Sequence, residues 1–198
     1  MITQLSRRIS SFFVDNNIIQ SEDKGVYSYS VEVLLASIFN LLAVVIIAIL
    51  SKRFIETVFF LFGFLPLRAV AGGYHAKTQL RCFLLLMFTY ALFLLIIFRM
   101  PTLWFTALAI ASFGISGILV FLLSPIEDSN KPLSQEEKVS FKRKSRLSIA
   151  VYCLIIFSLL LTLPNTAVGL SLSLGMCSVA ISLLASKIKT LMPHRVLK

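Results

Sequence analysis

Six apolar runs, separated by short polar segments, constrain the fold of this 198-residue chain more than any other feature. A straight helix needs roughly 20 apolar residues to cross a bilayer, with a working range of about 17–25. The first, fourth and sixth runs meet this length, the fifth is near its lower limit, and the second and third are short. The runs occupy residues 31–50, 54–67, 83–98, 102–123, 147–163 and 166–186.

The composition agrees with lipid as the solvent for most of the chain. Hydrophobic residues make up 58%, charged residues 14%, and mean hydropathy is +0.90. A soluble domain of this size has too little interior to hide so much hydrocarbon. We therefore predict an all-α, polytopic integral membrane protein with about six transmembrane helices. It forms a single domain, residues 1–198, with its bundle at 31–186 and a basic tail at 187–198.

The first 20 residues predict an amphipathic helix. Apolar side chains recur there at helical spacing and oppose a basic, serine-rich face. Such a helix suits the membrane interface, with its apolar face in lipid and its cations toward anionic head groups. The alternative is a helix that covers the bundle from the cytoplasm. The two faces consist of Ile2, Leu5, Ile9, Phe12 and Phe13 against Ser6, Arg7, Arg8, Ser10 and Ser11.

The cations predict the orientation. If all six runs span the membrane, only Lys52, Arg53 and Arg99 lie on one side, and the other sixteen of the nineteen Lys and Arg residues lie opposite. The positive-inside rule then places both termini and the loop around residues 68–82 at the cytoplasmic face of the cell membrane. The net charge of +10 is explained by this asymmetry and does not indicate nucleic acid as a partner.

Residues 68–82 gather the chemistry of the chain. In an apolar setting they hold three cations, a glycine pair, one of two histidines and one of three cysteines. Because the second and third runs flank this motif and are short, we predict that it dips below the membrane surface, shielded by protein. Two ordinary tilted helices in a thinned bilayer are the alternative. The motif residues are Arg68, Gly72, Gly73, His75, Lys77, Arg81 and Cys82.

A cysteine with a neighbouring histidine supports acyl transfer. The thiolate attacks a peptide carbonyl and the imidazole protonates the leaving amine. His75 and Cys82 are the candidates, but seven residues of continuous helix would separate them by about 10.5 Å along the axis. A catalytic pair therefore requires a turn before the third run. Gly72 and Gly73 provide the positive φ that such a turn needs, and backbone N–H groups there are candidates for an oxyanion hole.

The motif contains no carboxylate that would orient the imidazole. Gln79, Glu32 and Asn40 are candidates for this third group, and a helix-start carboxylate is the plainer interpretation of Glu32. Arg68, Lys77 and Arg81 are candidates for binding an acidic part of a substrate. We expect no metal and no cofactor, because the sequence has no paired-cysteine, HExxH, Walker or dinucleotide pattern.

A second polar segment follows the fourth run. Pro125 and Pro132 end the helix, and residues 134–137, Ser-Gln-Glu-Glu, resemble a capping box that begins the next one. The basic side chains after it either hold the helix end against lipid phosphates or bind an acidic segment of a partner. They are Lys142, Arg143, Lys144 and Arg146.

The pattern Arg68-x-x-x-Gly72-Gly73-x-His75-Ala76, with Cys82 after it, resembles the signature of the AgrB family of membrane cysteine endopeptidases. The segment from Pro125 to Leu133 and the basic stretch after it also resemble that family. The resemblance implies that Cys82 is the nucleophile and His75 its acid/base partner. The substrate would be an AgrD-like amphipathic propeptide of quorum sensing, cleaved through a thioester and closed to a lactone or thiolactone.

Two other functions stay open from the residues. A peptide transporter or channel would use the cationic motif as a binding site, and a signalling scaffold would use no chemistry at all. The small residues Gly114 and Gly117 in the fourth run also permit a homodimer.

Overall fold

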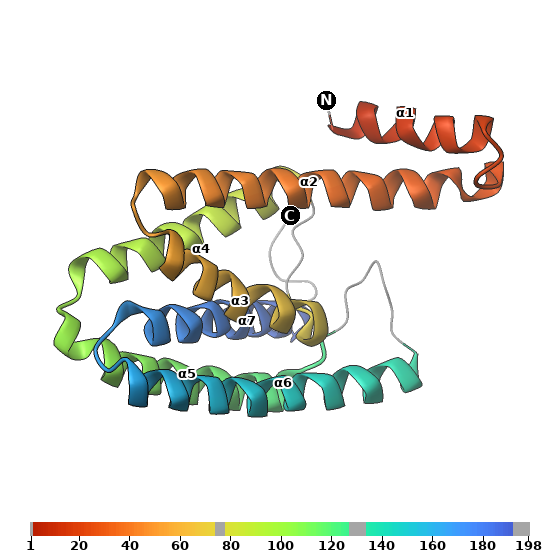
Figure 1. The fold of residues 1–198 in the computed structure, drawn as a ribbon. Helices are drawn as coiled ribbons and strands as arrows, with labels where there is room; N and C mark the ends of the chain where they lie inside the picture. The colour runs from red at the N-terminus through yellow and green to blue at the C-terminus, as the bar shows by residue number, and fades with distance from the viewer. Residues whose placement is uncertain (1, 74–77, 127–133, 192–198) are drawn as a thin grey trace, which may run out of the picture. The chain divides into compact units, whose positions relative to one another are not determined.

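The computed structural model describes residues 2–73, 78–126 and 134–191 (Figure 1). These residues form seven α-helices and two short 3₁₀ helices, η1 (Ser21–Asp23) and η2 (Thr102–Trp104). They divide into two compact units, Met1–Ser51 and Lys52–Lys198. The prediction of a single domain stays a prediction.

The N-terminal unit is a helical hairpin. α1 (Ile2–Asp15) packs antiparallel to α2 (Lys24–Leu50), the chain reversing through η1 (Figure 1). Ser6 and Ser10 are the buried residues of α1, and their hydroxyls bond to carbonyls one turn back in the same helix. Small side chains with internally satisfied hydroxyls let two helices approach closely.

This hairpin confirms a helix within residues 1–20 but assigns its faces differently from the sequence prediction. The two serines expected on the polar face are buried, and Ser6 Oγ lies 3.5 Å from Ser28 Oγ of α2. The apolar Leu5 and Phe12 are exposed, at 46% and 59%. The contact of α1 with lipid stays a prediction.

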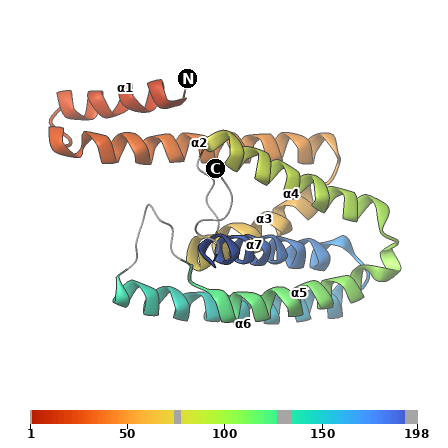
Figure 2. The ribbon, with the colours of Figure 1, turned by 180° about the vertical axis from the view of Figure 1, so that it is seen from behind.

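The C-terminal unit contains five helices arranged around the last of them. α7 (Ala167–Leu191) contacts α3 (Phe54–Ala71), α4 (Gln79–Arg99), α5 (Phe105–Leu123) and α6 (Gln135–Thr162). Figures 1 and 2 show α7 between α3 and the pair formed by α5 and α6. Of its most apolar 18 residues 56% are buried, against at most 28% in the other five long helices. α7 is therefore the central helix of this unit.

Two glycines bring the backbones of α3 and α7 into contact. A Cβ added to Gly63 would lie 2.3 Å from the Leu172 carbonyl oxygen, and one added to Gly175 would lie 2.2 Å from that of Phe60. Both distances are below contact, so only glycine fits at either position. In lipid, where apolar burial drives helix association weakly, such close packing is a main source of stability.

Buried hydroxyls link helices elsewhere in this unit. Tyr152 of α6 donates to the carbonyl of Phe62 in α3 (2.8 Å), four residues before Pro66. Proline has no N–H, so the Phe62 carbonyl loses its usual partner inside the helix. Tyr152 replaces that partner. Its ring also meets the Phe62 ring edge-on, with the ring centroids 5.8 Å apart.

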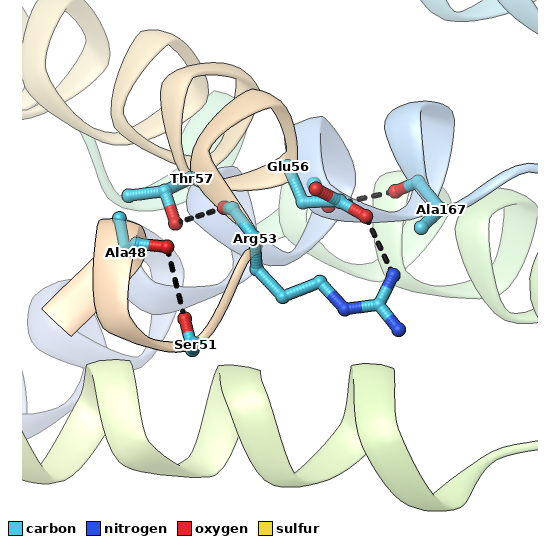
Figure 3. Close-up of polar contacts among 7 residues, drawn as sticks. Ala48, Ser51, Arg53, Glu56, Thr57 and Ala167 are labelled. Atoms are coloured by element: carbon cyan, nitrogen blue, oxygen red, sulfur yellow. Dashed lines mark hydrogen bonds and ion pairs between the residues drawn. The ribbon is translucent and has the colours of Figure 1, made fainter.

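The start of α3 is held by a small polar cluster (Figure 3). Arg53 Nη1 pairs with Glu56 Oε1 at 2.7 Å, and its guanidinium lies over the Phe98 ring. Thr57 donates to the Arg53 carbonyl and lies 2.7 Å from the Tyr90 hydroxyl of α4. These contacts join the first turn of α3 to α4.

Six helices of the described chain are long and apolar enough to cross a membrane, which confirms the all-α, polytopic prediction. The second and third are longer than their apolar runs: α3 continues four residues to Ala71, and α4 starts four residues earlier, at Gln79. Backbone hydrogen bonding continues past the change in hydropathy, so both ends of the motif are helical. The predicted capping box of α6 is also present, with Ser134 and Glu137 bonded reciprocally. The orientation in the membrane stays a prediction.

Candidate functional site

The glycine pair ends α3. The N–H of Gly72 donates to the Arg68 carbonyl (3.2 Å), and φ is +76° at Gly72 and +129° at Gly73. Both values lie in the region that side chains disfavour and glycine tolerates. The chain therefore turns out of the helix at these two residues. Because the Gly72 N–H closes the helix, it is occupied within the chain, and the oxyanion role stays a prediction.

Arg68 is bonded within the chain at the same place. From the last turn of α3, its Nη1 donates to the Gly72 carbonyl and to Ser182 Oγ of α7 (3.0 Å). Gly73 is buried directly against this guanidinium: a Cβ on Gly73 would lie 1.9 Å from Arg68 Nη1 and 2.8 Å from Ser182 Oγ. The missing side chain of Gly73 makes room for the arginine. We call Arg68, Gly72, Gly73 and Ser182 the arginine clamp.

The segment after α5 lies against the end of α3. The Ile126 N–H donates to the Ala71 carbonyl (3.1 Å), and Ile126 and Gly72 form a parallel β-bridge. A Cβ on Gly72 would lie 2.3 Å from the Ile126 carbonyl oxygen, so this contact also requires glycine. The two polar segments found separately in the sequence thus meet through residues 71–72 and 126.

The other side of this contact is anchored to α6. The Ser124–Pro125 peptide bond is cis, and Ser124 Oγ donates to Ser145 Oγ (2.8 Å). Both serines are buried, and Ser145 Oγ also contacts the Lys142 carbonyl (3.1 Å). A buried hydroxyl that lacks a partner is costly, so this chain of bonds fixes the start of the segment.

The predicted nucleophile lies at the start of α4. Thr78 is extended and caps the helix, its Oγ1 accepting from the Arg81 N–H (3.3 Å). The Cys82 N–H donates to the Thr78 carbonyl (3.1 Å), which places Cys82 in the first turn with an exposed side chain. Arg81 is exposed and Gln79 is half-buried. The thiol therefore lies at the surface of this unit.

Four other predicted site residues keep the roles that the sequence predicts for them, as predictions. His75 and Lys77 lie outside the described residues, and their roles stay predictions. Glu32 and Asn40 belong to α2 of the N-terminal unit, where Glu32 accepts a hydrogen bond from Thr3 (2.9 Å). The requirement for a break before Cys82 is met, because Thr78 is extended and α4 does not continue before Gln79.

The sequence missed three contributors to this arrangement: Ser182, Ser145 and Ile126. Ser182 stands in an apolar run 114 residues after Arg68, and no local pattern distinguishes it from the other serines of α7. The prolines near Ile126 indicated a loop but gave no information about what that loop contacts. Within the described residues, no group of three His, Cys, Asp or Glu side chains could hold a metal ion.

Comparisons with known proteins cover most of the chain. A family model described as accessory gene regulator B, AgrB, matches residues 6–183. Among curated proteins, AgrB-like proteins from three strains of Listeria monocytogenes are each 23% identical over 151 residues, which is 74% of this chain and 72% of theirs. No solved structure matches the chain.

Proposed function

The chain belongs to the AgrB family, which is involved in the processing steps of agr quorum sensing, and on this premise we propose that it is a membrane-embedded cysteine endopeptidase. Its substrate is an AgrD-like amphipathic propeptide at the membrane, cut to release the C-terminal part. Cys82 is the nucleophile and His75 the acid/base group. The observation that carries this proposal is the placement of Cys82, with an exposed side chain, on the first turn of a helix that begins after a break.

The proposed reaction has two acyl transfers. The Cys82 thiolate attacks the scissile carbonyl, a C–S bond forms, and the C–N bond breaks as His75 protonates the leaving amine. A Cys or Ser side chain of the peptide then attacks this thioester and gives up its proton. The new bond closes a thiolactone or lactone ring, the enzyme C–S bond breaks, and the Cys82 thiol is regenerated. No water is consumed, so shielding of the thioester from solvent favours cyclisation over hydrolysis.

The charges near the thiol suggest how the substrate is held. Arg81 is exposed one residue before Cys82 and is available to an acidic peptide segment. Arg68, by contrast, is engaged in the arginine clamp, so we assign it a positioning role and leave attraction of the acidic segment to Arg81 and Lys77.

The same proposal includes three further features: contact of the protein with anionic lipid, a homodimer, and a site at the cytoplasmic face. Gly117 faces Ile149 of the same chain, which leaves Gly114 as the more open glycine of α5.

Trapping of the acyl-enzyme tests the proposal. The protein is co-expressed with an AgrD-like precursor, and intact-mass spectrometry searches for a peptide–enzyme thioester. We expect the adduct and the cleaved C-terminal fragment with the natural protein and neither with Cys82→Ala. Cys82→Ser should bind the precursor without releasing the fragment. Cleavage that persists in Cys82→Ala would refute the assignment.

Cys82→Ser separates the peptidase from a carrier, because only the peptidase needs the thiol. A transporter that uses the motif only by charge should tolerate Cys82→Ser and fail in Arg81→Gln. A scaffold should show no turnover in any variant. The matched control for Arg81→Gln is Arg99→Gln, which removes a cation at the opposite end of α4.

A further inference from the structure

We propose that Ser182 of α7 is a positioning residue of the peptidase site, acting through Arg68. The proposal rests on the function proposed above and adds a residue 100 positions from Cys82 in the sequence. Ser182 touches no reacting atom. Ser182 holds the Arg68 guanidinium, and that guanidinium holds the end of α3. The serine thereby fixes the direction in which the chain leaves α3 at the glycine pair, before His75.

The contacts of Arg68 link the end of α3 to α7. Arg68 Nη1 reaches the Gly72 carbonyl on one side and Ser182 Oγ on the other, so the serine sets where the guanidinium lies. The Gly72 carbonyl is part of the peptide bond that joins Gly72 to Gly73. The backbone of Gly73 packs against the same guanidinium. Any shift of Arg68 is therefore passed directly to the glycine pair.

A second, independent set of contacts holds the end of α3 in place. Ile126 bonds to the Ala71 carbonyl and pairs with Gly72, independently of the bonds from Arg68. Gly72 and Gly73 take conformations open to few other residues and have many alternatives of their own. Glycines have wide backbone freedom and stay in one conformation only where their surroundings fix them. Here the Arg68 side chain and the backbone at Ile126 fix them.

Ser182 is suited to this role by its position on the central helix. α7 contacts every other α-helix of its unit, whereas the ends of α3 and α4 are connected by residues 72–78. A hydroxyl on α7 therefore ties the site to the most buried helix of the unit. Misplacement of a catalytic group by about 1 Å can lower a rate by about 100-fold.

The test compares Ser182→Ala with Ser178→Ala, a matched control one turn earlier on α7. Ser178 is half-buried as Ser182 is, but its hydroxyl bonds to the Leu174 carbonyl of its own helix. Precursor cleavage is measured with full-length protein in lipid nanodiscs. We expect Ser182→Ala to lower kcat by about 10- to 100-fold with KM and the unfolding temperature nearly unchanged. Ser178→Ala should match the natural protein.

Ser182→Thr provides the conservative rescue. It keeps the hydroxyl, and a helical threonine can place its Oγ1 in either of two rotamers. We expect it to recover most of the lost kcat. Equal kcat in Ser182→Ala and the natural protein would overturn the proposal. A fall in kcat that Ser178→Ala shares, or that tracks a lower unfolding temperature, would also overturn it in favour of a purely structural role.

A second readout separates this inference from the proposed function. In a His75→Cys variant that also carries Cys153→Ala and Cys177→Ala, copper phenanthroline with oxygen oxidises two thiols to a disulfide between positions 75 and 82. We expect Ser182→Ala to slow that reaction several-fold and Ser178→Ala to leave it unchanged. If the natural protein cleaves no precursor, the peptidase proposal fails, and the disulfide rate still decides on positioning. Equal rates in the two serine variants would refute it.

Discussion

The hydrogen bond from Tyr152 to the Phe62 carbonyl leads to a prediction about stability. Phe62 stands four residues before Pro66, so its carbonyl lacks the N–H that would bond to it inside α3. Tyr152, only 4% exposed, supplies the missing donor from α6. We therefore predict that Tyr152→Phe costs stability in the natural protein and costs much less in a Pro66→Ala background, where the substitution restores a backbone N–H at position 66.

The expected magnitude follows from what is lost. A buried polar group without a partner costs about 1–3 kcal/mol. Hydrogen bonds between membrane helices measured by double-mutant cycles average about 0.6 kcal/mol and reach about 1.7. The Phe62 carbonyl has no alternative donor at position 66 of its own helix, so we expect a cost near the upper end, about 1–1.5 kcal/mol. In Pro66→Ala the cost should fall below about 0.5 kcal/mol, a coupling of about 1 kcal/mol.

The four proteins of the cycle are the natural protein, the two single variants and the double variant. Each is unfolded reversibly by denaturant in mixed micelles, and helix content is measured along the titration. Tyr90→Phe is the matched control, because its hydroxyl contacts the Thr57 side chain instead of a freed carbonyl. Its cost should be the same in the natural and the Pro66→Ala backgrounds, within about 0.5 kcal/mol. An equal cost of Tyr152→Phe in both backgrounds would show that Pro66 does not make the Phe62 carbonyl dependent on Tyr152.

Three further predictions concern the packing, the site and the topology. Gly175→Ala places a Cβ 2.2 Å from the Phe60 carbonyl oxygen and should destabilise the unit by about 1–3 kcal/mol in a thermal melt, whereas an unchanged melt would contradict the backbone contact. Gly73→Ala places a Cβ 1.9 Å from Arg68 Nη1 on a residue whose φ is +129°. This variant should not cleave the precursor, as measured by mass spectrometry; a fully active variant would show that the arginine clamp is not needed. In a variant that carries Cys153→Ala and Cys177→Ala, an impermeant maleimide should label Cys82 in inside-out vesicles only, and labelling of right-side-out vesicles would reverse the predicted orientation.

The sequence predicted the parts of the fold that depend on local patterns. Hydropathy located six helices, and the capping residues Ser134 and Glu137 located the start of α6. The glycine pair predicted a turn before Cys82, and both glycines take positive φ. These features depend on neighbours within a few residues, so the sequence carries them directly.

Contacts between distant segments could not be predicted in the same way. Apolar periodicity is weak in helices surrounded by lipid and protein, so it does not show that α7 is central or that Gly63 and Gly175 lie against carbonyls. On α1, hydropathy separated serine from leucine correctly but could not show that small size, more than polarity, decides which face packs on α2. The bond between Arg68 and Ser182 likewise depends on how two helices meet whose residues are 114 positions apart.

The central position of α7 has a consequence for biogenesis. Domains form during synthesis from the N-terminal side, and α7 is the last of the seven described helices to leave the ribosome. Until then, the surfaces of α3 and α5 that pack against it face lipid or the insertion machinery. The nascent protein should therefore be a loose set of inserted hairpins, protected from proteolysis only after its final span is released.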